Sequence, residues 1–291
     1  MKRLLKWLTI MVGGLLGLII LVLAGIWLVS ASRLNRTYEV TANFSLDIPN
    51  DAGSIAEGKR FYAIMCAHCH GENLAGLQLS DDFLTFGRIY AANLTSGAGG
   101  LGQIYSDEDF ARAIWYGVKP DGSPTVAMPV EFNRGIHQKD MENLIAYIRS
   151  VPPEDAAYPE LSPGPLLRVM HVTNMFPLVT AEVADLNAAP PGVVAPEDIL
   201  GHGEYLSVLC TGCHGPDFTG GNMGEPSLVP VLSNWSEAQF MHALRTGQRP
   251  DGTTLNDEEM PWPAFSNFTD DEIHAIWTYL QSIEAVASLK Q

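Results

Sequence analysis

The chain has 291 residues, of which 33 are Asp or Glu and 17 are Lys or Arg, giving a formal net charge of −16. An electrostatic field of this sign repels nucleic acid, so we expect no nucleic-acid partner. The length is sufficient for two domains of ordinary size, and only four cysteines are available for covalent or metal chemistry.

The first element in chain order is an apolar segment. Residues 7–29 contain no charged side chain, and as a helix they would extend about 34 Å. That length crosses a bilayer and places Trp7 and Trp27 near its two interfaces. Three of the first six residues are basic, and basic termini stay in the cytoplasm. We therefore expect residues 1–36 to be a single-pass anchor in the cytoplasmic membrane, with the rest of the chain on the periplasmic or extracytoplasmic side.

A cleaved signal peptide is the alternative, because residues 29–31 read Val-Ser-Ala, a possible cleavage sequence of small residues. The apolar stretch is longer than the core of a usual signal peptide, which favours an uncleaved anchor. Residues 1–36 hold five basic side chains and no acidic one, so the remainder carries a net charge of −21. This charge suits steering of a cationic partner, and it equally suits simple solubility.

Two pentapeptides of the form C-x-x-C-H use all four cysteines, and we call residues 66–70 and 210–214 the first and second haem motif. This is the attachment sequence of covalently bound haem c. Cysteines three apart on a helical turn share one face, so they can reach both vinyl groups of one porphyrin, and the adjacent histidine supplies an axial nitrogen to iron. We predict two covalently bound haem c groups. The predicted attachment residues are Cys66, Cys69, Cys210 and Cys213, and the predicted proximal iron ligands are His70 and His214.

Other uses of the four cysteines fit the sequence less well. An all-cysteine zinc site usually places its two pairs much closer together in sequence. A thioredoxin-like redox centre needs one C-x-x-C pair and no histidine after it. Simple disulfides agree with export but leave the two histidines unexplained.

The haem motifs belong to an internal duplication. After each motif the same signals recur: a helix ending in glycine, a Pro-Asp-Gly turn, a Met-Pro step and a closing amphipathic helix. The closing helices are expected at residues 139–150 and 270–283, and a capping box at Thr269 begins the second one. The pattern predicts a mainly α protein with two tandem haem domains, at residues 37–151 and 196–291.

Residues 152–195 lie between the two copies and are rich in proline, so we expect a linker with one short helix at 166–175. The Met-Pro step follows His70 by 58 positions in the first copy and His214 by 46 positions in the second. We expect the twelve extra residues of the first copy in its glycine-rich loop at 93–102.

Met128 and Met260, each followed by proline, are the predicted distal ligands of the two irons. A neutral thioether favours Fe(II) and suits electron transfer, and the proline stiffens the loop that presents the sulfur. A core methionine is the alternative at both positions. Six other histidines could replace a methionine, and the one to check first is His171 on the linker. These histidines are His68, His137, His171, His202, His242 and His274.

Residues 52–151 and 196–284 resemble the class I c-type cytochromes. Segments 93–95, 106–110 and 128–129 look like the haem domains of cytochrome subunits that accept electrons from membrane-bound alcohol dehydrogenases. The resemblance implies small, mainly helical haem domains with histidine and methionine on opposite sides of each iron. Those subunits commonly carry three haem domains, whereas two haem motifs occur here.

We therefore expect a membrane-tethered dihaem cytochrome that carries single electrons between respiratory or photosynthetic redox proteins. Its donor and acceptor would be a quinol-oxidising complex, a dehydrogenase or a terminal oxidase. One alternative is a redox enzyme with an open iron, acting on peroxide or a sulfur compound; another is a cytochrome subunit fixed in a dehydrogenase complex. An electron-transfer protein or subunit is expected rather than an enzyme, because no third histidine occupies an obvious ligand position.

Overall fold

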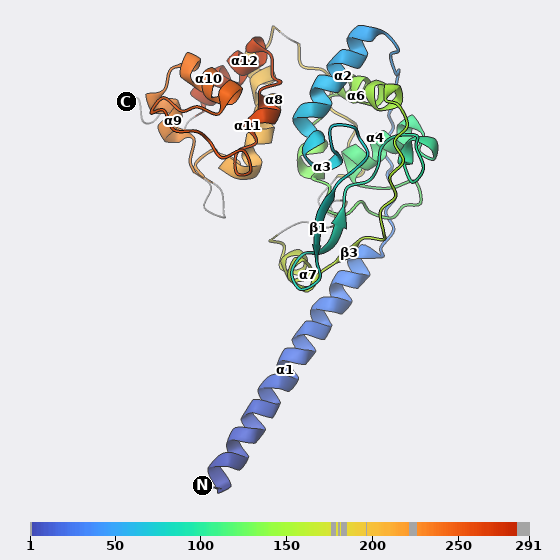
Figure 1. The fold of residues 1–291 in the computed structure, drawn as a ribbon, viewed down its shortest axis with the longest axis vertical. Coiled ribbons are helices and arrows are strands. Elements are labelled where there is room, and N and C mark those ends of the chain that lie inside the picture. The colour runs from blue at the N-terminus through green and yellow to red at the C-terminus, as the bar shows by residue number, and fades with distance from the viewer. Residues whose placement is uncertain are drawn as a thin grey trace.

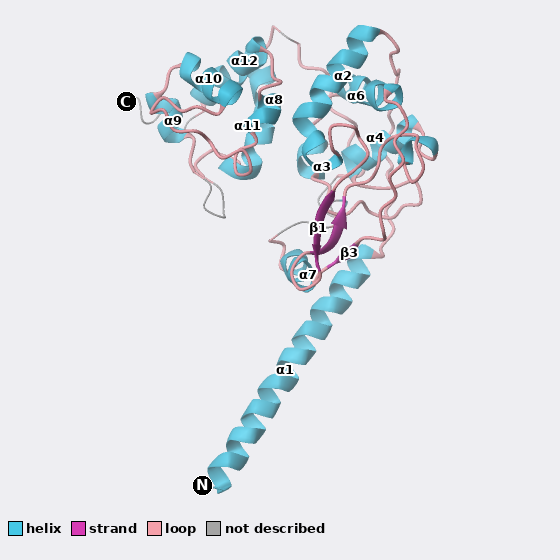
Figure 2. Cartoon of the chain, viewed as in Figure 1, coloured by secondary structure: helices cyan, strands magenta, loops and turns pink. Residues whose placement is uncertain are grey.

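The computed structural model describes residues 2–175, 179, 181, 185–195, 197–220 and 226–283. Two helical domains lie side by side, and a long helix, α1, projects from the first of them (Figure 1). Within the described residues, the strands form one small antiparallel sheet in the order β1-β2-β3, which belongs to the first domain (Figure 2). The predicted mainly α fold class is confirmed.

Helix α1 (Lys2–Leu34) consists almost entirely of apolar residues and buries only Ser30. Nothing in its most apolar stretch is covered by the rest of the protein. In the part of the chain that the structure describes, it is the one helix long and apolar enough to cross a membrane. A membrane anchor and a signal sequence both meet this description.

The two domains follow the same order of helices, and the sheet is an addition to the first. The helices of the first domain are α2 (Ala52–Met65), α3 (Ala67–His70), η1 (Leu101–Gln103), α4 (Asp107–Tyr116), α5 (Val130–Asn133) and α6 (Gln138–Ser150). Its sheet and the helix after it are β1 (Gln78–Asp82), β2 (Gly87–Tyr90), β3 (Ser162–Pro163) and α7 (Pro165–Val172). The second domain contains α8 (Ile199–His214), α9 (Val229–Asn234), α10 (Glu237–Thr246), α11 (Trp262–Phe265) and α12 (Asp270–Ser282). The expected closing helices correspond to α6 and α12, each within one residue.

Matching local signals begin and end the equivalent helices. Ser106, Ser236 and Thr269 form capping boxes at the starts of α4, α10 and α12, and the one at Thr269 was expected from the sequence. Helices α4 and α10 both stop at a glycine in the left-handed conformation, Gly117 with φ 67° and Gly247 with φ 71°. The duplication therefore extends to the residues that set the helix boundaries.

In each domain the first long helix crosses the last one at a glycine. A side-chain carbon added to Gly58 of α2 would collide with the backbone carbonyl of Asn143 in α6. One added to Gly203 of α8 would collide in the same way with Ala275 in α12. These glycines let the helix backbones touch, and the domain cores pack around the two crossings. The core residues include Tyr62, Phe110, Trp115, Leu144 and Ile145 in the first domain and Leu206, Phe240, Ile273, Ile276 and Leu280 in the second.

Most of the extra residues of the first copy do not lie where we expected them. The N–H of Leu94 donates to the carbonyl of Leu74 in the first domain, and Leu228 donates to Phe218 in the second. Leu74 and Phe218 both have φ 61° and both follow their motif histidine by four positions, so the two pairs are equivalent. The residues of the first pair are 20 positions apart and those of the second pair 10, and the β1–β2 hairpin accounts for the difference. The prediction at residues 93–102 was wrong because motif spacing gives the size of an insertion and not its place.

The segment expected as a linker packs against the first domain through much of its length. The carbonyl of Glu154 accepts a hydrogen bond of 2.7 Å from Asn93, and the carbonyl of Ala188 accepts one of 2.7 Å from Tyr116. Its predicted helix is present as α7, which is shorter than expected. Proline-rich composition gave no sign of these contacts, because they are made by backbone carbonyls.

The two domains touch each other through equivalent surfaces. Arg60 of α2 donates two hydrogen bonds to Glu272 of α12, of 2.7 and 2.9 Å. Tyr205 of α8 donates one of 2.7 Å to Asp140 of α6. Arg60 lies two positions after Gly58, and Tyr205 lies two positions after Gly203, so these two residues are equivalent. Asp140 and Glu272 are equivalent as well, because each lies three positions before the residue that its helix places against the glycine. The same contact is thus made twice with the roles of the domains exchanged, as in a dimer with two-fold symmetry.

The crossing at Gly203 predicts a large effect of a small substitution. Gly203→Ala should destabilise the holoprotein by about 1–3 kcal/mol, because the added methyl group forces two helix backbones apart. Gly192→Ala is the matched control, since nothing lies near that glycine. Denaturant unfolding followed by circular dichroism measures both variants. Equal stability of the two would contradict the role given to the crossing.

Candidate haem sites

The first haem motif lies at a break between two helices, whereas the second is the end of one continuous helix. Cys66 closes α2 with φ −120°, outside helical geometry, and α3 then carries the rest of the motif. Helix α8 runs through Cys210 to the end of the second motif. Eight positions separate Gly58 from Cys66, but only seven separate Gly203 from Cys210. The additional residue explains the break. A continuous helix with one more residue would rotate the first motif away from the position that the second motif has in its domain, and the break at Cys66 corrects this.

The thiols of both motifs lie in apolar surroundings. All four cysteines are partly buried and none forms a disulfide. Burial raises the pKa of Cys66 and of Cys210 to about 12, and the other cysteine of each motif adds to the increase. A reactive redox pair has a lowered thiol pKa instead. Over the residues described, no three His, Cys, Asp or Glu side chains are grouped to hold a metal ion, so the two pairs do not form a zinc site.

Each motif histidine is oriented by a backbone carbonyl. Nδ1 of His70 lies 2.9 Å from the carbonyl oxygen of Ala92, and Nδ1 of His214 lies 2.7 Å from that of Pro226. A carbonyl oxygen only accepts, so Nδ1 carries the proton and Nε2 keeps its lone pair. Burial also lowers the pKa of His70, which favours the neutral ring. This is the form in which an imidazole binds iron, with a second partner fixing its tautomer.

Each predicted distal methionine lies in the same apolar cluster as the haem motif of its own domain. Met128 packs on the first core together with Cys66, and Met260 packs on the second core together with Cys210. Both side chains are partly buried, and each precedes a proline that caps a short helix, α5 or α11. Methionine and motif therefore belong to the same apolar core in both domains, and ligation by these sulfurs stays a prediction.

The remaining histidines have other surroundings. His137 and His202 both contact the ring of Tyr205, His137 by stacking with ring centroids 3.7 Å apart. His171 is buried in α7, and its backbone carbonyl accepts a hydrogen bond from Arg33 of α1. These three histidines thus belong to the domain interface and to the contact between α1 and α7. The exposed ones are His68, His242 and His274.

Two protein families match the chain, one in each domain. The profile of the family described as cytochrome c matches residues 55–152, and that of cbb3-type cytochrome c oxidase subunit III matches residues 201–280. The chain is a c-type cytochrome with two haem domains. Cytochrome c domains carry covalently bound haem c, and two such domains account for two haems. The residues present fit this group, because each motif offers neutral thiols in an apolar setting and a histidine with Nε2 as acceptor.

This dihaem cytochrome is similar to cytochrome subunits of dehydrogenases. It is 28% identical to the alcohol dehydrogenase (quinone) cytochrome c subunits of Gluconacetobacter polyoxogenes and Komagataeibacter europaeus, over 86% of this chain and 60% of each relative. It is 26% identical to the fructose dehydrogenase cytochrome subunit of Gluconobacter japonicus, over 78% of this chain and 51% of that protein. The chain therefore spans between half and three fifths of the length of these relatives.

Among solved structures, a reducing HAO-like protein complex of Kuenenia stuttgartiensis aligns with 81% of this chain and 99% of its own, at 19% identity and a TM-score of 0.26. A similarity this low does not establish a shared fold.

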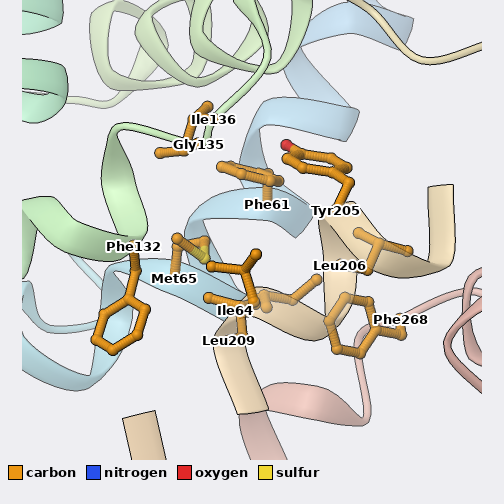
Figure 3. Close-up of a pocket in the computed structure, with 11 residues that line it drawn as sticks. Phe61, Ile64, Met65, Phe132, Gly135, Ile136, Tyr205, Leu206, Leu209 and Phe268 are labelled. Carbon is orange, nitrogen blue, oxygen red and sulfur yellow. The ribbon is translucent and has the colours of Figure 1, made fainter. Parts of the chain in front are cut away.

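The two haem motifs of the cytochrome lie on either side of the domain interface. An apolar pocket there is lined by Met65, which directly precedes the first motif, and by Leu209, which directly precedes the second (Figure 3). Phe132 of α5 also lines it, and a carbon added to Gly212 inside the second motif would come 2.8 Å from the Phe132 ring. The first domain thus covers part of the second haem motif.

Sequence reasoning missed the polar residues that hold this interface. Burial raises the pKa of the Asp140 carboxyl, and the hydrogen bond from Tyr205 acts in the opposite direction by stabilising the carboxylate. Neither residue belongs to a haem signature, and Arg60 and Tyr205 differ in chemistry although they are equivalent. The duplication was the available signal, because a contact from one copy predicts its counterpart in the other.

Breaking both polar contacts should loosen the arrangement of the two haem domains. In Arg60→Ala/Tyr205→Phe we expect weaker magnetic coupling between the ferric haems, measured by electron paramagnetic resonance of the holoprotein. Each lost bond should also cost about 1–3 kcal/mol of stability, because a buried or half-buried carboxylate loses its donor.

The matched control is Arg149→Ala/Tyr158→Phe, which removes an ion pair of 2.8 Å and a hydroxyl bond of 2.8 Å inside the first domain. It should lose stability while keeping the coupling of the parent protein. The same change of coupling in both variants would show that the interface contacts do not set the separation of the haems.

Proposed function

We propose that this cytochrome is a membrane-tethered dihaem electron carrier. His70 and Met128 would ligate one iron, and His214 and Met260 the other. The observation that carries the proposal is the repeated arrangement of an anchored histidine and a methionine in the apolar cluster of each motif. Two protein ligands at each iron would suit electron transfer, because they would leave no position for a substrate.

Haem, when bound, supplies an Fe(III)/Fe(II) couple that takes up and releases one electron. The carbonyls of Ala92 and Pro226 hold the two proximal histidine rings in a fixed orientation and tautomer. The apolar cores exclude water from the motifs and thereby favour the state of lower charge. The polar contacts between the domains keep the two motifs at a constant separation, which supports passage of an electron within one chain.

In this proposal α1 is the tether and the haem domains lie on the extracytoplasmic side of the cytoplasmic membrane. The helix is long and apolar enough to span a bilayer, and its basic residues are concentrated at the N-terminal end. Tethering raises the effective concentration of the carrier beside membrane-bound complexes. Its exported part, with a net charge of −21, favours a docking surface with basic residues on the partner.

We propose a membrane-bound dehydrogenase as the class of redox partner, with a quinol-oxidising complex or a terminal oxidase at the other end of the electron path. The support is that the relatives are named as cytochrome subunits of quinone alcohol dehydrogenase and of fructose dehydrogenase. The same names favour a second candidate function, a cytochrome subunit fixed in such a complex. Copurification of a dehydrogenase polypeptide in mild detergent at constant stoichiometry would distinguish the fixed subunit from the free carrier.

The distal ligands can be tested by removing each sulfur. Met128→Ala and Met260→Ala should each lower one of the two reduction potentials, by on the order of 0.1 V, within the ~0.8 V range that axial ligands span. Each variant should also gain one haem that binds carbon monoxide. An optical redox titration with ferric and ferrous spectra measures both effects.

Met175→Ala is the control, because Met175 is 71% exposed on the protein surface and should leave both potentials unchanged. A Met128→Ala protein with the parent spectrum and potentials would show that Met128 is not a ligand. Carbon monoxide binding by the parent protein would favour the enzyme with an open iron.

The anchor can be tested by extraction. Alkaline carbonate should leave the holoprotein in the membrane fraction, because it releases peripheral proteins but not spanning helices. The intact mass should include residues 1–36 apart from any loss of the initiating Met. A carbonate-soluble protein that starts after residue 31 would identify the segment as a cleaved signal peptide.

A further inference from the structure

Four large apolar side chains lie exposed together on the first domain. Phe83, Leu84 and Phe86 occupy the turn between β1 and β2 and are 82%, 77% and 45% exposed, and Leu166 at the start of α7 is 42% exposed. We call these four residues the hairpin patch. The hairpin that carries three of them supplies most of the residues by which the first copy exceeds the second. Exposed apolar groups of this size mark contact sites with other molecules or with lipid.

Hydrogen bonds hold the hairpin patch in shape. The N–H of Gly164 donates to the carbonyl of Phe86 at 2.8 Å, and that of Leu166 donates to Thr85 at 3.1 Å. The Asp82 carboxylate accepts from the backbone of Leu84 at 3.0 Å, and its other oxygen accepts from the Thr85 hydroxyl at 2.6 Å. The turn and the start of α7 are therefore joined, which fixes the backbone that carries the apolar side chains.

Helix α7 in turn packs against the last turns of α1. The guanidinium of Arg168 lies 3.9 Å from the centre of the Trp27 ring and donates to the hydroxyl of Ser30 at 3.2 Å. Arg33 of α1 donates to the backbone carbonyl of His171 at 3.3 Å. Figure 1 shows α7 and the lower end of the sheet beside this end of α1. The hairpin patch is thus fixed next to the place where the apolar helix ends.

The position along α1 at which α7 makes this contact indicates what covers the hairpin patch. A bilayer core about 30 Å thick takes up about 20 helical residues, so a span starting at Trp7 reaches the lipid headgroups near Trp27. Resting on the proposed membrane tether, we infer that the hairpin patch inserts into the extracytoplasmic interface of the bilayer that α1 spans. The first haem domain then lies against the membrane in a fixed orientation instead of swinging on its anchor.

The charges around the patch agree with a lipid surface despite the acidity of the whole chain. Asp81 on the hairpin is paired with Arg88 at 3.5 Å, and the Asp82 carboxylate is engaged by its own turn. Arg33 is partly exposed at the same end of α1, where lipid phosphates would be, whereas Arg168 is buried against Trp27. A protein partner within the membrane would need the same apolar side chains, and the experiment distinguishes it from lipid.

The test measures the surroundings of position 84 directly. Full-length Leu84→Cys holoprotein is spin-labelled at the new thiol and placed in nanodiscs of phosphatidylcholine and phosphatidylglycerol. The expected result is relaxation of the label by oxygen, which dissolves in lipid, and loss of its relaxation by a water-soluble nickel chelate. Ile104→Cys is the matched control, since Ile104 is 71% exposed on the same domain outside the hairpin, and its label should respond to the chelate. Equal responses to the chelate at both positions would overturn the inference.

A second measurement does not depend on an added label. Linear dichroism of the haem bands in oriented bilayers should be strong for the parent protein and reduced in Phe83→Asp/Leu84→Asp, while Ile104→Asp should keep the parent signal. Unchanged dichroism in the double variant would also overturn the inference. A label at position 84 that meets water in nanodiscs but is shielded in native membranes would assign the patch to a protein partner instead.

The proposed tether and the hairpin patch fail in different ways. Extraction of the parent holoprotein by alkaline carbonate would disprove the tether, whatever the label at position 84 reports. A retained protein whose label meets water would disprove only the docking of the patch.

Discussion

The close crossing of two helices at a glycine is the constraint on which both domains depend. In each domain, the helix that carries the crossing glycine also leads into the haem motif, and the helix that it crosses provides an acidic residue at the domain interface. The contact at Gly58 or Gly203 therefore determines both the position of the haem motif and the position of the interface residues. It places the cysteines and histidine on the core of their own domain, and it sets the surface that meets the other domain. A displaced crossing would move both.

Duplication explains how a single chain obtained such an interface. Two copies of one fold that associate through the same surface make each contact twice, and the pairs Arg60–Glu272 and Tyr205–Asp140 retain that relationship. The two pairs differ in chemistry, because one is an ion pair and the other a hydroxyl bonded to a carboxylate. The contacts occupy equivalent positions although their residues differ, so both can hold the two motifs at one separation.

Local signals made much of this molecule predictable. The haem motifs, the capping residues and the Met-Pro steps each depend on a few adjacent residues, and the structure forms the expected helices around them. The interface could not be predicted in the same way, because Arg60 and Tyr205 are ordinary surface residues until the second domain covers them. Nor did the proline-rich segment indicate that its backbone carbonyls pair with Asn93 and Tyr116. Sequence patterns indicate the local conformation of a segment, whereas these contacts depend on how the segment packs against the rest of the folded domain.

The two domains differ most at the end of the first domain that carries the β1–β2 hairpin and α7. The β1–β2 hairpin and α7 belong to the first domain, and α7 holds the end of α1 through Arg168 and Trp27. The second domain lies beside α2 of the first domain, farther from α1 than the hairpin and α7 are (Figure 1). In a tethered protein the hairpin and α7 would bring the first domain, and not the second, into contact with the membrane. The asymmetry added to a symmetric pair therefore distinguishes the two domains, because only the first carries the apolar hairpin and the contact with α1.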